Sequence, residues 1–404
     1  MGKPKIRFKG YEDDWEQCKV SEIGNIVTGS TPKTSISDNY GGEFLFVSPA
    51  DIQENRYVDE TITTLTKKGF DQGRKIREKA SLFVSIGSTI GKVAQTSQES
   101  TTNQQINAVE PYDNFDDDFI FTSLENISGS IKAIASNQAV PIVNKTTFGE
   151  TEIKVPSELA EQQKIGAYFR NLDHLITLHQ RKCEETKSLK KYMLQKMFPE
   201  NGKCVPKIRF SGFSDDWEQR KLNEIADKVS EKNKNNEFSE PFTNSAEQGI
   251  ISQKDYFDRE IVNNENLDGY YIVRNDDFIY NPRISVTAPV GPINRNRLGR
   301  NGVMSPLYTV FRTHDIDNLY LEFYFKTTKW HCFMKLNGDS GARFDRFTIS
   351  STQFMKMPIP YPTLEEQRKI GKYFDSLDHL ITLHQHKCDE LQKLKKFMLQ
   401  NMFM

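Results

Sequence analysis

The sequence predicts an α+β fold in which two globular domains of mixed α/β structure are separated by two long antiparallel, coiled-coil-like helices in a pseudo-twofold tandem repeat. Two repeated segments predict this arrangement. LDHLITLHQ occurs at 172–180 and again at 377–385, and a segment running from PKIRF to DDWEQ occurs at 4–17 and again at 206–219. Internal repeats at this distance indicate two similar halves in tandem.

Long helices are predicted around both copies of LDHLITLHQ. Over 158–197 and 363–402, apolar residues recur every three or four positions, which is the spacing of one helical face. Ser157 stands where a helix N-cap belongs. An apolar stripe on a helix of about 60 Å favours pairing of the two helices, although each helix could instead pack only on its own domain. The predicted seam, which is also a candidate partner-binding surface, comprises Ile165, Phe169, Leu172, Ile176, His179, Cys183, Ile370, Phe374, Leu377, Ile381, His384 and Cys388.

Mixed α/β domains are predicted before each helix. Short runs rich in β-branched and aromatic residues, separated by Gly, Pro, Asn and Asp, are typical of strands. They lie at 43–47, 57–64, 81–86, 91–96, 142–143, 270–273, 277–280, 307–311 and 357–359, and short helices are expected at 118–136 and 317–336. The predicted boundaries are 1–157 for the first domain, 158–198 for the first helix, 199–361 for a linker and the second domain, and 362–404 for the second helix.

Composition describes a globular chain. Of its 404 residues, 36% are hydrophobic and 27% are charged, and the net charge of −1 excludes a uniformly basic nucleic-acid-binding protein. Any DNA-binding role therefore needs its Lys and Arg gathered on one face. Five scattered cysteines, and the lack of a long apolar run, predict a cytoplasmic location.

The order of several motifs resembles the specificity subunits of type I restriction–modification enzymes, which are bacterial defence complexes. The motifs are GSTPKTS…YGGEFLFVSPADI at 29–52, GSTIGKVA at 87–94, YYIVRNDDFIYNPR at 270–283, MSPLYTVF at 304–311, and EQxKIGxYFxxLDxLI in each helix. The resemblance implies two target-recognition domains, each reading half of an interrupted double-stranded DNA site. It also implies that the helices fix the gap and bind methyltransferase subunits, two being expected, and that restriction subunits join through the complex.

Polar loops are the candidates for DNA contact. Arg, Asn, Gln, Ser and Thr match base edges, and Lys and Arg bind phosphates. The candidates are Ser30, Thr31, Lys33, Lys92, Asn103 and Gln104 in the first domain, and Asn281, Arg283, Ser285, Arg295, Arg297, Arg343 and Arg346 in the second. Alternatively these are ordinary solvated loops, and Asn103 and Gln104 could bind backbone groups within the domain.

Catalytic and metal motifs are incomplete. GDSG at 338–341 lacks the His and Asp partners of a protease nucleophile, and GSTIGK lacks the pattern of a phosphate loop. His179 and Cys183, with His384 and Cys388, could form a zinc set across antiparallel helices, but a semi-polar packing layer is favoured. We predict no metal and a non-catalytic DNA reader, with S-adenosylmethionine, ATP and Mg expected on partner subunits. A fused methyltransferase or nuclease is the alternative, and a protein-binding adaptor is a third.

Overall fold

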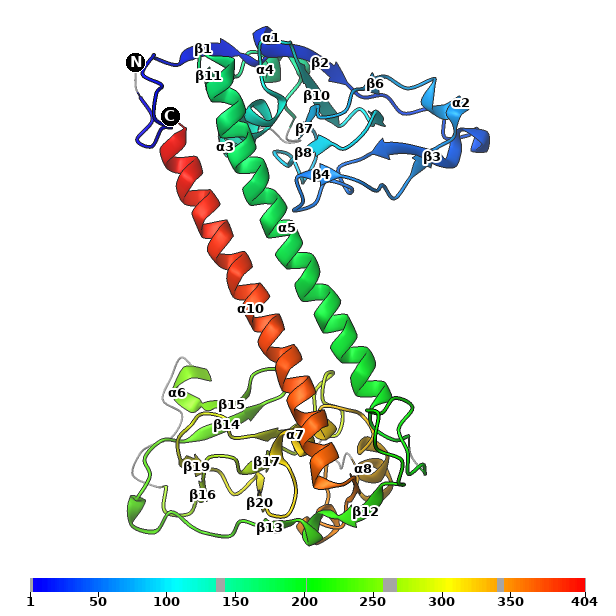
Figure 1. Ribbon diagram of the computed structural model, residues 1–404, viewed down its shortest axis with the longest axis vertical. Helices are drawn as coiled ribbons and strands as arrows, with labels where there is room; N and C mark the ends of the chain where they lie inside the picture. The colour runs from blue at the N-terminus through cyan, green and yellow to red at the C-terminus, as the bar shows by residue number, and fades with distance from the viewer. Residues whose placement is uncertain (1–2, 136–141, 201, 257–266, 340–344, 404) are drawn as a thin grey trace. The chain divides into compact units, whose positions relative to one another are not determined.

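The structure is a computed structural model that describes residues 3–135, 142–200, 202–256, 267–339 and 345–403. The chain divides into two compact units (Figure 1). Unit 1 comprises Met1–Lys182 and Leu383–Met404, and unit 2 comprises Cys183–Thr382. Each unit therefore contains one globular domain and a section of both long helices.

The two predicted long helices are confirmed. Helix α5 spans Leu159–Lys196 and helix α10 spans Leu364–Met402. Helix α5 ends shortly before Pro199, which cannot continue the backbone hydrogen-bond pattern of a helix.

Within each unit, contacts between α5 and α10 show that the two helices run antiparallel. The contacting pairs are His179–His384 and Asp173–Lys395 in unit 1, and Lys190–Asp378 and Phe198–Phe374 at the end of α5 in unit 2. In both units, the residue numbers on α10 rise as the numbers of the residues that face them on α5 fall. The pair Lys190–Asp378 is the pair Lys395–Asp173 with the two helices exchanged, because each residue lies 205 positions from its copy. The repeat in the sequence is therefore also a repeat of contacts.

Two larger sheets and one two-stranded sheet build the domain of unit 1 (Figure 1). Five strands, β2 (Gly24–Thr28), β10 (Ile106–Pro111), β7 (Ser81–Val84), β8 (Val93–Thr96) and β4 (Tyr57–Val58), are ordered β2-β10-β7-β8-β4. Four more, β5 (Thr64–Leu65), β3 (Tyr40–Val47), β9 (Ser100–Thr102) and β6 (Lys75–Ile76), are ordered β5-β3-β9-β6. Strand β1 (Glu16–Lys19) pairs with β11 (Glu152–Val155). The helices of this domain are α1 (Val20–Ile23), α2 (Lys67–Phe70), α3 (Asp117–Ala135) and α4 (Lys145–Gly149), with a 3-10 turn at Ser37–Asn39.

Unit 2 repeats the central strand order. Its main sheet is β13-β20-β17-β18, formed by Ala226–Lys228, Thr309–Thr313, Phe278–Tyr280 and Ile293–Arg295, which matches β2-β10-β7-β8. Three two-stranded sheets pair β12 (Glu218–Lys221) with β21 (Pro358–Tyr361), β14 (Phe242–Ser245) with β15 (Gly249–Ser252), and β16 (Tyr271–Val273) with β19 (Gly302–Met304). The remaining helices are α6 (Gln253–Tyr256), α7 (Asn318–Phe325), α8 (His331–Asn337) and α9 (Ser351–Phe354), with 3-10 turns at Leu222–Glu224 and Lys234–Asn236.

Three predicted elements are wrong in extent. The single helix expected at 317–336 is two helices, α7 and α8. It breaks at Thr327, whose hydroxyl donates to the Tyr324 carbonyl at 2.7 Å and accepts from the Lys329 N–H at 3.2 Å. These side-chain bonds replace the continuing helical bonds. The single strand expected at 57–64 is instead two short strands, β4 at Tyr57–Val58 and β5 at Thr64–Leu65. The strand expected at 142–143 is only an isolated bridge between Ile142 and Ile86.

The predicted seam residues are mostly buried in the cores of the two units. Ile165, Phe169, Leu172 and Ile176 of α5 join the core of unit 1, together with Cys388 of α10. The copies Ile370, Phe374 and Leu377 join the core of unit 2. Burial of these side chains supplies the hydrophobic stabilisation of each unit. Because these side chains are buried within their own unit, they form the helix seam and are not free to form a partner-binding surface.

The repeated EQxKIG motif attaches each domain to its helix. Arg7 of the first PKIRF segment donates to both oxygens of Glu161 at 2.7 and 2.8 Å, and Arg209 of the second donates to Glu366 at 2.7 and 2.9 Å. Paired bonds of this kind fix orientation as well as distance.

The glutamine and the glycine of the same motif hold the helix that follows the main sheet. Gln162 accepts a hydrogen bond from the Asp116 N–H at 3.0 Å, just before α3. A Cβ atom at Gly166 would lie only 2.7 Å from the Phe119 backbone nitrogen, so only glycine permits this approach. Gln367 repeats the contact in unit 2 by accepting from the Asp317 N–H at 2.9 Å.

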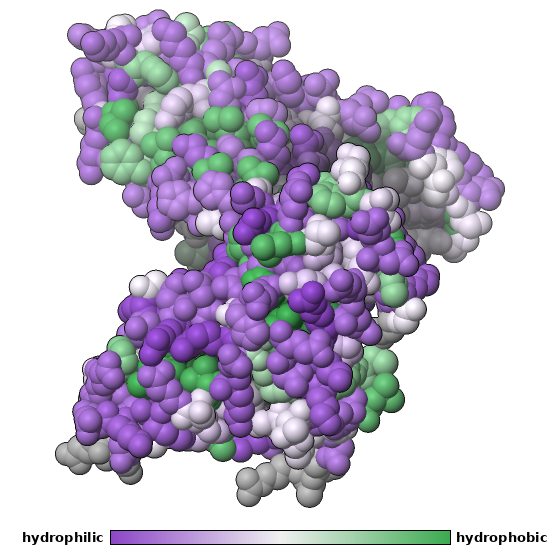
Figure 2. Space-filling view, turned by 60° about the horizontal axis from the view of Figure 1, so that its bottom comes forward, coloured by the Kyte–Doolittle hydropathy of each residue, from purple (hydrophilic) through white to green (hydrophobic). Residues whose placement is uncertain are grey.

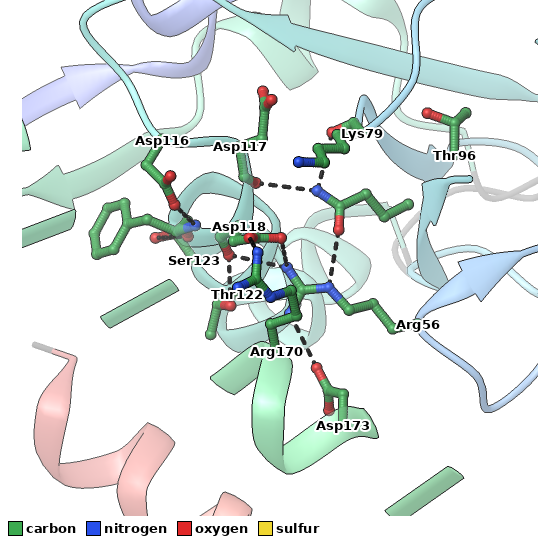
Figure 3. A network of polar contacts seen from close by, with 12 residues as sticks. Arg56, Lys79, Thr96, Asp116, Asp117, Asp118, Thr122, Ser123, Arg170 and Asp173 are labelled. Carbon is green, nitrogen blue, oxygen red and sulfur yellow. Dashed lines mark hydrogen bonds and ion pairs between the residues drawn. The ribbon is translucent and has the colours of Figure 1, made fainter. Parts of the chain in front are cut away.

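A buried ion network adds to the attachment in unit 1 (Figure 3). Arg56, which is 5% exposed, donates to Asp118 of α3 at 2.7 Å and to Asp173 of α5 at 3.1 Å. Arg170 of α5 also donates to Asp118, at 2.8 Å. Because Arg56, Asp118 and Asp173 are shielded from water, each depends on its partners, and removal of one would leave others unpaired. The Arg170 side chain is partly exposed.

The face of the molecule seen in Figure 2 is mainly polar. Hydrophilic residues cover most of the visible face, and hydrophobic residues form small separate patches on it (Figure 2). Within the described ranges, no helix combines the length and the apolar character needed to cross a membrane. All five cysteines are free thiols.

Candidate nucleic-acid interface

A polar cavity of about 480 Å³ lies beside the end of β17 in unit 2. Its wall includes many amide, hydroxyl and guanidinium groups, which hydrogen-bond to base edges and phosphates, together with apolar side chains and one carboxylate, that of Glu247. The polar lining residues include Thr243, Asn244, Ser245, Gln248, Gln253, Asn281, Arg283, Ser285, Thr287, Ser305 and Tyr308. The structure therefore brings the predicted residues Asn281, Arg283 and Ser285 into one site.

Asn281 shapes this cavity. Its side-chain amide donates to the Asn244 carbonyl at 2.8 Å, and its side-chain oxygen accepts from the Arg283 N–H at 2.9 Å. Ser285 in turn accepts from the Ala288 N–H at 3.1 Å. These bonds hold the loop after β17 in one conformation, so that Arg283 is presented on an ordered backbone.

Arg283 and Arg346 are the two arginines that the fold brings together. They form an antiparallel β-bridge, although they are far apart in the sequence. Hydrogen bonds flank the bridge, from the Ile284 N–H to the Asp345 carbonyl at 3.0 Å and from the Phe347 N–H to the Pro282 carbonyl at 2.8 Å. Residues directly opposite in such a pair place their side chains on the same face. The described part of the chain gives neither guanidinium an ion-pair partner, so together they favour an anionic ligand such as DNA.

Arg295 and Arg297 lie elsewhere and have a different environment. Both donate to Glu322 of α7, at 2.9 and 2.8 Å, and Arg297 also reaches Asp375 of α10 at 3.1 Å. Burial alone would raise the pKa of Glu322, but Lys326, Arg295 and Arg297 together bring it below its ordinary value. Arg297 thus joins the domain to α10 within unit 2, and both guanidinium groups are held by carboxylates of the unit itself. Arg343 lies outside the described residues.

In unit 1 a second polar site lies between the loop after β2 and the loop before β10. Thr31 donates to the Gln104 side chain at 2.6 Å, and both residues are exposed. The Ser30 hydroxyl accepts from the Arg74 N–H at 3.2 Å. The structure therefore brings Ser30, Thr31 and Gln104 together. It also adds the exposed Arg74, which sequence reasoning missed; the adjacent pair Arg74-Lys75 in a turn was the available signal.

The other candidates of unit 1 are placed differently. Asn103 is used within the loop, since its side chain accepts from the Gln105 N–H at 3.0 Å. This agrees with the alternative role expected for it. Lys92 donates to the Ile52 carbonyl at 2.9 Å in a separate cavity, and Lys33 is exposed.

The two sites occupy the same place in the repeated sheet. Ser85 follows β7, and Asn281 follows the matching strand β17. In unit 1 the Ser85 N–H donates to the Gln105 carbonyl at 2.7 Å, on the loop before β10. The corresponding loop before β20 contributes Ser305 and Tyr308 to the cavity of unit 2. The frame is thus shared, whereas the side chains that it presents differ.

A family model described as "Type I restriction modification DNA specificity domain" matches residues 12–188 and 214–393. The chain belongs to this family. Each match of the specificity domain covers one globular domain and most of the long helix that follows it. The chain is therefore a type I specificity subunit with two target-recognition domains in tandem, which confirms the family and the fold class expected from the sequence.

Individual relatives agree with the specificity-subunit assignment. The type I restriction enzyme MjaVIII specificity subunit of Methanocaldococcus jannaschii is 22% identical over 399 residues, which cover 95% of this chain and 91% of that protein. The HindI specificity subunit of Haemophilus influenzae is 33% identical over 170 residues, 40% of this chain and 37% of that protein. The solved S subunit from M. genitalium has the same fold, with a TM-score of 0.65 at 14% identity over 100% of this chain and 99% of that chain.

Proposed function

We propose that this specificity subunit reads a bipartite double-stranded DNA site, with one target-recognition domain on each half, and that it has no catalytic activity of its own. The observation that carries the proposal is the equivalence of the two polar sites. They lie at the corresponding ends of two matching sheets. Unit 1 presents Thr31 and Gln104 there, whereas unit 2 presents Arg283 and Arg346. A duplicated frame with different contact residues suits a target whose halves differ in sequence.

The helices offer two copies of a surface for methyltransferase subunits. Apolar side chains stay exposed at matching positions: Leu175, Leu394 and Phe397 in unit 1, and their copies Leu380, Leu189 and Tyr192 in unit 2. Exposed apolar side chains of this size favour protein contact. Two equivalent sets support two methyltransferase subunits, with restriction subunits joining through the complex. We assign S-adenosylmethionine, ATP and Mg to those partners, and the five free thiols support a cytoplasmic location.

Exchange of one target-recognition domain tests the proposal. Replacement of residues 20–155 by the corresponding segment of another specificity subunit should change one half of the recognised sequence and leave the other half and the gap unchanged. Sequencing that maps methylated adenines in a host carrying the assembled complex measures both halves at once. A change in both halves would contradict independent reading by the two domains.

A methylation assay separates the reader from an enzyme. The purified chain, incubated with target DNA and S-adenosylmethionine, should transfer no methyl groups, whereas the complex with methyltransferase subunits should methylate the target. Methyl transfer by the chain alone would instead favour a fused methyltransferase.

A further inference from the structure

A second cavity in unit 2, of about 520 Å³, lies where α5, α10 and the turn between α7 and α8 meet. Five lysines and a single carboxylate, that of Asp378, are among the residues that line it. The lysines are Lys187, Lys190, Lys191, Lys326 and Lys329. This concentration of positive charge is distinct from the polar cavity beside Arg283.

The floor of the cavity is already organised around two of these lysines. Lys190 and Lys326 both reach Asp378, and their ammonium groups lie 5.2 and 5.0 Å from the centroid of the Phe323 ring. Partial burial lowers the pKa of Lys190, Asp378 opposes that shift, and the nearby charge of Lys326 adds to it. Asp378 is thus shared by two cations, of which Lys190 is partly buried, and another anion would stabilise this arrangement.

Carboxylates outside the cavity lining pair with two of the five lysines. Lys326 binds Glu322 at 3.3 Å, and Lys187 binds Glu184 at 2.7 Å. Lys191 and Lys329 form no ion pair with the residues that the structure describes, and Lys191 is exposed. Their positive charges are therefore available to a ligand.

Unit 1 provides an internal comparison, because a cavity of about 270 Å³ occupies the same place in its frame. The pair Lys395–Asp173 there corresponds to Lys190–Asp378. Its charged lining is balanced, with three acidic residues, Glu54, Glu125 and Asp173, and three basic residues, Arg56, Lys92 and Lys395.

Sequence differences at matching positions cause the contrast. Asp116 and Asp317 accept from the N–H three residues ahead at the start of α3 and α7, each at 2.9 Å, and this aligns the two helices. By that alignment, Lys326 and Lys329 of unit 2 occupy the positions of Glu125 and Ser128 in unit 1. Because unit 1 holds its domain on the helices without these lysines, the attachment does not require them.

We propose that this basic cavity binds phosphate esters, and that the backbone of DNA outside the recognised bases supplies them. The ammonium groups lie on two helices and a turn and would hold phosphates without reading sequence. The cavity would then add affinity to unit 2 alone. This inference rests on the proposed DNA-reading function and assigns it a second, sequence-independent contact.

Salt-dependent DNA binding by the chain in complex with its methyltransferase subunits tests the cavity. The double variant Lys191→Ala with Lys329→Ala should bind target and scrambled duplexes with equal loss, on the order of tenfold, and the slope of log K against log salt should fall by about two. Lys191→Arg with Lys329→Arg should keep the slope. The matched control is Lys393→Ala with Lys396→Ala on α10, which removes equal charge, includes the copy of Lys191 and lies outside both cavities. It should leave the slope unchanged.

The other outcomes are decisive in different ways. ATP could instead protect the wild-type complex, but not the double variant, against heat. If the slope of log K for DNA binding against log salt were also the same in both, the phosphate would be assigned to a free nucleotide. Unchanged behaviour in both assays, an equal slope change in the control, or weakened assembly with the methyltransferase subunits would overturn the proposal. Failure of the wild-type complex to distinguish target from scrambled DNA would instead overturn the proposed reading function.

Discussion

At the residue scale, the pairing of Arg283 with Arg346 matters most for recognition. Both are candidates because one arginine can form two hydrogen bonds to a guanine base. Their adjacency, however, depends on a single β-bridge between distant segments. Arg295 and Arg297 show the opposite case. They looked like a basic cluster in the sequence, but their guanidinium groups bind Glu322. Local sequence shows that an arginine is present, whereas its partner is decided by chain segments that it cannot identify.

Arg283→Ala should reduce discrimination at one position of the half-site read by unit 2, by about 1–3 kcal/mol if the side chain contacts guanine through two hydrogen bonds. The half read by unit 1 should keep its specificity. Binding of the assembled complex to duplexes with single substitutions measures this. The control is Arg300→Ala, which removes an exposed arginine paired with Glu240. An equal loss on every duplex would identify Arg283 as a phosphate contact instead.

Gly166→Ala should destabilise unit 1 by about 1–3 kcal/mol, because the added Cβ would lie 2.7 Å from the Phe119 nitrogen at a packed contact. Denaturant unfolding gives the change in the free energy of unfolding. Gly129→Ala is the matched control: it lies in α3, nothing lies within 4 Å of its added Cβ, and it should stabilise by about 0.5–1 kcal/mol. Equal stability of the two variants would show that the close approach at Gly166 does not matter.

At the scale of elements, the long helices combine polar and apolar contacts within their pairing. His179 and His384 face each other with 3.0 Å between their Nδ1 atoms, so one ring donates and the other accepts when both are neutral. This is the semi-polar layer that the sequence predicts. In the part of the chain that the structure describes, no group of three or more His, Cys, Asp or Glu side chains suited to a metal is found.

The histidine pair should make the helices pH-sensitive. Burial, followed by the charges of His384, Lys182 and Lys387, lowers the pKa of His179 below its ordinary 6.5. The unfolded chain therefore takes up a proton first as pH falls, so this contribution to stability is present above about pH 6.5 and is lost below it. The free energy of unfolding, measured from pH 5.5 to 7.5, should rise less in His179→Gln than in the wild type. His174→Gln, on the exposed side of α5, should keep the wild-type dependence; equal slopes in the two variants would refute the idea.

At the scale of the whole molecule, duplication explains why one chain carries two readers. The same motif, EQxKIG, fixes each domain to its helix through Glu161 and Glu366. Each unit also includes a section of both helices. We therefore expect the length of the helix pair to set the number of base pairs between the two half-sites, since helices are stiff and linkers are not.

Insertion of four helical residues after both Leu178 and Leu383 should lengthen the gap by about two base pairs, because four residues add about 6 Å of helix and DNA rises about 3.4 Å per base pair. The two sites match in the repeat, so the paired insertion keeps the facing residues of each unit in register on both sides of the insertion, although His179 and His384 no longer face each other. Methylation mapping measures the gap. Insertion into α5 alone should instead disrupt the pairing and abolish assembly, and an unchanged gap in the paired insertion would exclude the helices as the spacer.

The sequence by itself determined the two-fold repeat, the helices and most of the main strands, because these depend on local periodicity that is visible in any window of the chain. It also supplied the residue types suited to DNA contact. Only the tertiary structure decided which of them meet. It pairs Arg283 with Arg346 and places Arg74 beside Ser30. It also engages the side chains of Asn103 and Arg295 in hydrogen bonds within their own domains. The physical reason is that hydrogen bonds and ion pairs between distant segments depend on the packing of the sheets and helices, which no local pattern records.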